Sequence, residues 1–148
     1  MERKSKFRRD KDYSVIIGCG RLGATIASSL SDMGKNVLIM DTKEDSFRKL
    51  SPSFAGQTMV GDATDYSVLK EANISQATVL IPVTHSDNTN IMISQIAKEI
   101  FNVETVIARL YDPERDVVYK EFGIETIYPA YLESSQVLKW YGGDGDDE

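Results

Sequence analysis

The residues with the clearest chemical potential are three glycines that are followed, one strand later, by an acid. The glycines stand at the first, third and sixth positions of a short turn, Gly18-Cys19-Gly20-Arg21-Leu22-Gly23. At this spacing the first glycine permits a tight bend, the second lets the backbone approach a pyrophosphate, and the third lets the next helix pack closely on a strand. Free N–H groups at the start of that helix attract anions, and Arg21 adds a full charge. The turn therefore predicts a phosphate-binding site.

Asp41 supplies the second half of this motif. It ends the next apolar run, about 20 residues after the turn, where an acid accepts hydrogen bonds from ribose hydroxyls. Its charge would repel a 2′-phosphate, which favours NAD over NADP, and Thr42 and Lys43 beside it are further candidate contacts. Strand, turn, helix, strand and acid in this order predict a dinucleotide-binding βαβ unit. The alternative is a Rossmann-like fold whose site is empty or degenerate.

Six apolar runs separated by helical patterns must position these residues. Strands are expected over residues 13–17, 36–40, 57–60, 78–82, 104–110 and 124–128. Helices are expected over residues 24–33, 44–50, 66–72, 88–101, 113–122 and 130–141. This alternation predicts an α/β fold: a doubly wound, Rossmann-type, six-stranded parallel sheet, followed by a last helix.

Three more strand ends bring candidate contacts to the same edge of the sheet. Asp62 and Ala63 follow the third strand and could line an adenine pocket, although a plain turn that caps a helix is the alternative. Thr84 and His85 follow the fourth strand, which must lie beyond the first strand and so creates a topological switch point. Arg109 ends the fifth strand and would bring a fixed charge to this edge.

The single cysteine and the single histidine limit the chemistry. One cysteine forms no disulfide within the chain and no cysteine-based zinc site, and Cys19 is expected to be a small packing residue; no metal site is predicted. His85 is expected to be a hydrogen-bonding or solvated side chain rather than a catalytic base. A dehydrogenase of this fold needs a second lobe and an acid or base, so we expect no enzyme activity. A small NAD-dependent oxidoreductase, or a subunit of one, is the alternative.

Composition and charge bound the remaining possibilities. With 148 residues, 41% of them hydrophobic and 27% charged, the chain has the composition of one globular domain. A net charge of −6 argues against general nucleic-acid binding. No apolar run approaches the length of a membrane span, and the N-terminus lacks the apolar segment of a signal peptide, so we expect a cytoplasmic protein. We divide the chain into a basic arm over residues 1–12, the nucleotide-binding domain over 13–141 and an acidic tail over 142–148.

The last predicted helix has more apolar surface than one sheet can cover. Its large apolar side chains are Tyr131, Leu132, Val137, Leu138, Trp140 and Tyr141. They either fold back on the same sheet or dock onto a second chain, and docking is favoured because five other helices already cover the sheet. The helix over residues 88–101 also has apolar residues beyond one stripe, which could be shared with another subunit.

Several segments together resemble a known family. VIIGCGRLG, LIMD, GDAT, LIPVTHSDNTN and VIARL, in this order, are similar to the N-terminal nucleotide-binding domain of Trk-type potassium-uptake regulators, called TrkA-N, RCK or KTN. Arg21 and the Gly61–Ala63 segment are more specific to this family than to dehydrogenases. The resemblance implies a cytoplasmic regulatory subunit that binds NAD(H), ATP, ADP or AMP and gates an integral membrane potassium channel or transporter at the inner face of the membrane.

The resemblance also implies how the chain assembles. Domains of this family form dimers and rings of eight, and their final helix crosses to a neighbouring subunit. Family members usually continue into a smaller C-terminal domain, whereas this sequence ends at Glu148. Two interpretations stay open: a single-domain subunit that pairs with itself or with a longer homologous subunit, or a truncated chain.

Overall fold

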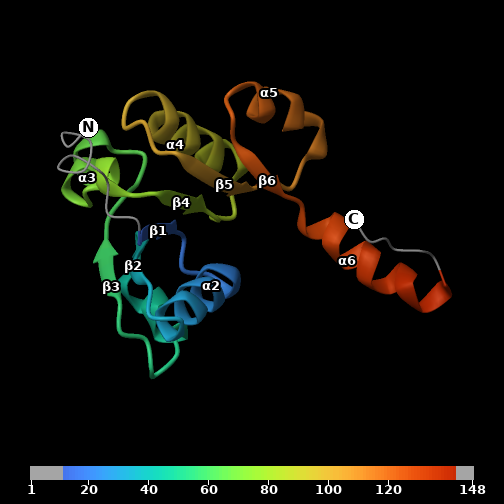
Figure 1. The fold of residues 1–148 in the computed structure, drawn as a ribbon, viewed down its shortest axis with the longest axis horizontal. Coiled ribbons are helices and arrows are strands. Elements are labelled where there is room, and N and C mark those ends of the chain that lie inside the picture. The colour runs from blue at the N-terminus through green and yellow to red at the C-terminus, as the bar shows by residue number, and fades with distance from the viewer. Residues whose placement is uncertain (1–11, 143–148) are drawn as a thin grey trace, which may run out of the picture.

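The computed structural model describes residues 12–142, and a parallel sheet of six strands runs through it (Figure 1). The strands are β1 (Tyr13–Ile17), β2 (Asn36–Asp41), β3 (Gln57–Val60), β4 (Val79–Pro82), β5 (Thr105–Arg109) and β6 (Glu125–Ile127). Their order across the sheet is β3-β2-β1-β4-β5-β6, and each neighbouring pair is parallel. The doubly wound Rossmann-type architecture predicted from the sequence is confirmed.

The first strand lies at the centre of this sheet, between β2 and β4. Ile17 pairs in register with Met40 of β2 and with Pro82 of β4, so the carboxyl ends of the three strands finish level with one another. After β3 the chain returns past β1 to form β4, and the direction of winding reverses there. The crevice of such a fold opens at this switch point, directly above the glycine turn.

Helices cover both faces of the sheet. The covering helices are α2 (Arg21–Asp32), α3 (Tyr66–Glu71), α4 (Asp87–Glu99) and α5 (Asp116–Glu121), and a further helix, α6 (Pro129–Leu138), follows β6. Successive strand residues point to opposite faces of the sheet. Val15 and Ile17 pack in the core beneath α3, α4 and α5, whereas Ile16 and Ile39 pack with α2. Figure 1 shows α4 and α5 on one side of the sheet and α2 on the other.

Several predicted boundaries need correction. The helix α2 begins at Arg21, three residues earlier than predicted, because Gly20 in an extended conformation forms its N-cap and Gly23 lies inside the helix. The predicted helix over residues 44–50 is a 3-10 segment, Glu44–Lys49. The predicted helix over 113–122 divides into a 3-10 turn, Pro113–Arg115, and α5. The predicted last helix over 130–141 ends as an α-helix at Leu138 and continues as a 3-10 turn, Lys139–Tyr141. The remaining ends agree with the prediction to within two residues, the usual variation between methods of assigning element ends.

The last helix projects from the body of the molecule (Figure 1). None of the α6 residues is buried, and the side chain of Trp140, in the 3-10 turn Lys139–Tyr141 that follows, is 88% exposed. Folding back on the same sheet is therefore not the arrangement of the described chain. Within residues 12–142 no helix is long and apolar enough to span a bilayer. Except for Asp12 and Gly142, the predicted basic arm and acidic tail lie outside the described residues.

Candidate nucleotide-binding cleft

A cavity of about 640 Å³ opens at the carboxyl ends of β1 to β4. Four chain segments line it: the glycine turn and the loops that follow β2, β3 and β4. The lining includes these predicted contacts: Gly18, Cys19, Gly20, Asp41, Thr42, Lys43, Asp62, Ala63 and Thr84. Its volume lies within the range of about 300 to 1,000 Å³ that is usual for small-molecule sites.

The three glycines of the turn meet different physical demands. Gly18 has a φ of +107°, and Gly23 packs so closely on the turn that a Cβ there would lie 1.9 Å from the carbonyl oxygen of Gly18. Both are therefore required by the backbone itself. At Gly20, by contrast, an added Cβ would have one described atom beyond its chain neighbours within 4 Å, Nε2 of His85 at 3.7 Å. The absent side chain at Gly20 leaves space in the cleft rather than relieving a clash.

Asp41 lines the cleft and is hydrogen-bonded to two of the segments that form it. One carboxylate oxygen accepts a hydrogen bond of 2.8 Å from the Cys19 amide, and the other accepts one of 2.9 Å from the Lys43 amide. These bonds join the glycine turn to the end of β2. The Cys19 thiol is buried and lies 3.3 Å from the carbonyl oxygen of Ser46. Burial, and then the charge of Asp41, raise the pKa of this thiol, so it stays protonated and packs as a small side chain.

The loop after β3 both lines the cleft and caps a helix. Asp62 accepts hydrogen bonds from the Thr64 hydroxyl (2.6 Å) and amide (2.9 Å), and these bonds lower the pKa of its carboxyl. Asp65 accepts from the Ser67 amide and caps α3. The two interpretations of this loop are compatible, because separate acids line the cleft and cap the helix.

The loop after β4, residues 83–86, forms the second wall of the cleft. A buried asparagine that the sequence does not predict as a site residue holds this wall in place. Asn90 of α4 is 0% exposed, and its side-chain oxygen accepts from the Thr84 amide (3.0 Å) and hydroxyl (2.7 Å). Its side-chain nitrogen donates to the carbonyl oxygens of Thr84 (3.1 Å) and Arg109 (2.9 Å). The available signal was an amide on the same helical stripe as Ile93 and Ala97, both buried.

Arg109 supports this wall from behind. Its guanidinium Nη2 donates to the carbonyl oxygens of Val83 (2.7 Å) and Thr84 (3.2 Å), and its Cζ lies 5.2 Å from the centre of the Tyr111 ring. The side chain is 8% exposed and lies outside the cavity lining. The charge that we expected at the ligand is turned toward backbone carbonyls at the end of β4. A carbonyl oxygen has two lone pairs, so the Thr84 oxygen accepts bonds from both Arg109 and Asn90.

The other members of the predicted motif belong to the first turn of α2. Arg21 is exposed and follows the cavity-lining residue Gly20 in the sequence. Leu22 is half-buried and packs against the core beneath α2. Neither residue lines the cavity itself.

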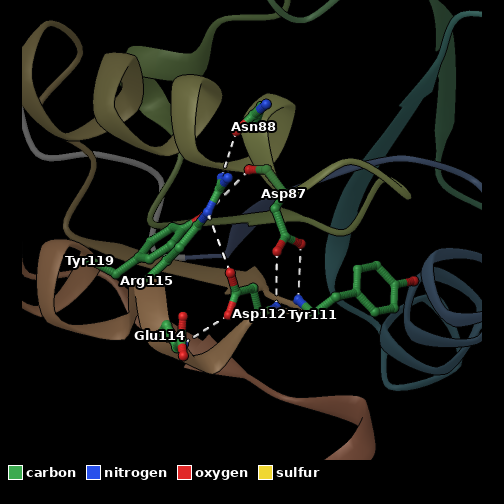
Figure 2. Close-up of polar contacts among 7 residues, drawn as sticks. All are labelled: Asp87, Asn88, Tyr111, Asp112, Glu114, Arg115 and Tyr119. Atoms are coloured by element: carbon green, nitrogen blue, oxygen red, sulfur yellow. Dashed lines mark hydrogen bonds and ion pairs between the residues drawn. The ribbon is translucent and has the colours of Figure 1, made fainter.

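A second set of contacts joins the wall to the loop after β5 (Figure 2). The Asp87 carboxylate accepts hydrogen bonds from the amides of Tyr111 (2.9 Å) and Asp112 (3.0 Å). The Tyr119 hydroxyl donates to the Asp87 carbonyl oxygen (3.3 Å), and the Arg115 guanidinium donates to the Asn88 side chain. The start of α4, the loop after β5 and α5 therefore form one connected unit.

Comparison with curated sequences places the chain beside potassium-uptake proteins. It is 40% identical over 127 residues to the Trk system potassium uptake protein TrkA of Streptomyces coelicolor, covering 86% of this chain and 57% of that protein. It is 33% identical over 109 residues to a TrkA homolog of Pyrococcus abyssi, covering 74% of this chain and 48% of that protein. The chain thus spans about half the length of these relatives.

Solved structures share the fold. The TrkA-N domain of the inner membrane protein ybaL from Escherichia coli superposes with a TM-score of 0.78 at 16% identity, covering 88% of this chain and 97% of that one. The AMP-bound Kef C-terminal domain of Shewanella denitrificans gives 0.74 at 18%, covering 90% and 83%. The NAD-bound GsuK channel gives 0.70 at 16%, covering 97% and 26%.

A protein-family model matches most of the chain. The model of the TrkA-N domain matches residues 14–129, from the start of β1 to the start of α6. This range includes the glycine turn, Asp41 and both walls of the cleft. The chain belongs to the TrkA-N domain family.

Proposed function

We propose that the cleft binds an adenine nucleotide, NAD(H), ATP, ADP or AMP, and that the bound nucleotide regulates potassium transport. The observation that carries the proposal is the cavity of about 640 Å³ between the open face of Gly20 and the carboxylate of Asp41. These two features lie where a Rossmann fold places a pyrophosphate and a ribose. The AMP and NAD in the structures of two fold neighbours are consistent with this choice of ligand.

Each part of the nucleotide has a proposed set of contacts. The glycine turn and the N-terminus of α2 would take the phosphates, with Arg21, the first residue of that helix, adding positive charge. Asp41, with Thr42 and Lys43, would take the ribose, and Asp62 and Ala63 the adenine. Thr84 would close the other side. Arg109 would act indirectly, because its guanidinium holds the carbonyls of the second wall.

The link to potassium rests on the family and its curated relatives, which are named Trk system potassium uptake proteins. We infer a regulatory rather than a catalytic role, at the cytoplasmic face of the membrane, where the domain acts on an integral membrane potassium channel or transporter. Because the chain spans about half of those relatives, its direct partner could be a second copy or a longer homologous subunit.

The last helix is the proposed contact with that subunit. Tyr131, Leu132, Val137, Leu138, Trp140 and Tyr141 are each more than half exposed. Large apolar side chains exposed together on one projecting segment are typical of protein–protein interaction sites. We propose that α6 crosses to a neighbouring subunit, so that a change in the nucleotide cleft alters how two domains are arranged.

Mass spectrometry of the small molecules released when the purified protein is denatured tests the ligand. We expect an adenine nucleotide, and we expect added NAD, ADP or AMP to raise the midpoint of thermal unfolding. A protein that releases no nucleotide and gains no stability from any of them would contradict nucleotide binding. The potassium role has its own test: removing the chain from its host should impair growth in potassium-limited medium, and unimpaired growth would contradict it.

A further inference from the structure

We infer that His85 is a specificity-determining residue of the cleft. Its imidazole contacts the phosphates of the bound nucleotide, and its protonation makes affinity for phosphate-bearing ligands rise as the pH falls. This inference rests on the proposed nucleotide site, which it deepens by adding a contact to the phosphates and a form of regulation.

The position of the imidazole relative to Gly20 carries the inference. His85 lines the cavity, and its Nε2 lies 3.7 Å from the point that a side chain on Gly20 would occupy first. Gly20 is the glycine whose bare backbone allows a pyrophosphate to approach. The imidazole and the phosphate-binding face of the turn therefore border the same volume, from opposite walls of the cleft.

The loop that presents His85 is held on both sides. Thr84 is bonded to Asn90 through its amide and hydroxyl, and the Ser86 amide donates to the Thr84 hydroxyl oxygen (3.2 Å). Ser86 in turn caps α4 by accepting from the Thr89 amide (3.2 Å). Among residues 12–142 no hydrogen bond or ion pair engages the imidazole, so its nitrogens are available to a ligand.

The charged and titratable groups around the imidazole come from every wall of the cleft. Those that line the cavity are Cys19 from the turn, Asp41, Lys43 and Lys49 from β2 and the segment after it, and Asp62 from the loop after β3. Arg21 and Asp87, the first residues of α2 and α4, follow the lining residues Gly20 and Ser86 in the sequence. The Asp87 carboxylate points toward the amides of Tyr111 and Asp112 (Figure 2). Carboxylates, lysines and arginines ordinarily keep their charge between about pH 5.5 and about pH 8, whereas histidine changes its charge there.

An imidazolium and a neutral imidazole differ strongly as phosphate ligands. The imidazolium offers two N–H donors and a positive charge, and a charge-assisted bond to an anion is about twice as strong as a neutral one. Phosphate binding therefore favours the protonated form, and by linkage protonation favours phosphate binding. Because His85 is exposed at the mouth of the cleft, we expect affinity to change by roughly fivefold across this pH range.

NAD is the suitable probe for calorimetric titration between about pH 5.5 and about pH 8. Its pyrophosphate is esterified at both ends, so it lacks the second ionisation at about pH 6 that a phosphate monoester has, and its charge stays constant in this range. Adenosine, which lacks phosphate, is the matched control ligand. His85→Gln keeps a hydrogen-bonding side chain of similar size but no longer titrates. We expect the parent to bind NAD roughly fivefold more tightly at the acidic end, with adenosine unaffected, and we expect the NAD affinity of His85→Gln to be independent of pH.

Three results would overturn the inference while leaving the nucleotide site intact: NAD affinity of the parent that does not vary with pH, the same pH dependence for adenosine, or a dependence that persists in His85→Gln. Failure of the parent to bind either ligand at any pH would instead overturn the proposed site, and the inference with it. Circular dichroism of His85→Gln verifies its fold, and the pH profile of the parent needs no variant.

Discussion

Asp41 combines two roles at the scale of a single residue. Its carboxylate already accepts hydrogen bonds from the amides of Cys19 and Lys43, and it also lines the cleft where a ribose is proposed. A carboxylate oxygen has two lone pairs, so each oxygen can accept a further bond from a ligand hydroxyl. The same group therefore shapes the glycine turn and remains able to bind.

Asp41→Ala should weaken every adenosine-containing ligand by about 1.5 to 3 kcal/mol, because charge-assisted ribose bonds are lost. It should also lower the free energy of unfolding, since the Cys19 amide loses its acceptor. Calorimetric titration and urea denaturation measure the two effects. Asp45→Ala is the matched control, because Asp45 pairs with Arg48 on the surface of the described chain. Equal affinities of Asp41→Ala and the parent for NAD, ADP and AMP would place the ribose elsewhere.

Asn90→Ala should lower the free energy of unfolding by about 2 to 4 kcal/mol. The substitution removes four hydrogen bonds of a fully buried side chain and leaves the half-buried Thr84 amide without its acceptor. Urea denaturation gives the difference, with Gln136→Ala on the exposed helix α6 as the control that should change little. A parent-like stability of Asn90→Ala would show that the second wall does not depend on this side chain.

These residues also show what a sequence can reveal about a site. The glycines and Asp41 could be predicted because their roles follow from the local chain and from fixed spacing. Asn90 and Arg109 could not be placed, because their partners lie on other strands and loops: the Asn90 amide joins the ends of β4 and β5, and Arg109 finds carbonyls at the end of β4. A local sequence pattern does not reveal either of these contacts, because each joins residues that are far apart in the chain.

At the scale of elements, the strands followed from the sequence more closely than the helices. Buried parallel strands are continuous apolar runs, so their positions are plain. Helix type was less visible: residues 44–49 form a 3-10 segment, and Pro113 starts a 3-10 turn before α5. Short segments of this kind owe their form to the contacts at their ends, such as the Asp112 side chain that caps the turn at Glu114.

Asp87 provides the clearest connection between two elements. Its carboxylate bonds to both amides at the start of the loop after β5, so Asp87→Ala should release that loop from α4. We expect faster hydrogen exchange at the amides of Tyr111 and Asp112, with a smaller change at β1. Asp112→Ala is the comparison: it removes the cap of the next turn but leaves both Asp87 bonds in place. Unchanged exchange in Asp87→Ala would mean that other contacts hold the loop.

At the scale of the whole molecule, α6 is the element that the sheet does not explain. Its projection from the body leaves Leu138 and Trp140 exposed, and we propose that a second subunit covers them. Leu138→Asp together with Trp140→Asp should therefore yield monomers that still bind nucleotide, whereas the parent should be at least a dimer. Light scattering alongside a nucleotide titration reports both properties. A parent that is monomeric at all accessible concentrations, with no companion subunit to assemble it, would contradict assembly through α6.

The central claim, that the cleft above the glycine turn binds an adenine nucleotide, is tested most directly by calorimetric titration of NAD into the parent and into Gly20→Val. The backbone at Gly20 has an ordinary φ of −86°, and an added side chain there would first meet the movable tip of His85, so the variant should fold. Circular dichroism verifies this. The account predicts that the parent binds NAD and that Gly20→Val does not, because the valine would occupy the space of the pyrophosphate. Equal binding by both proteins would contradict it.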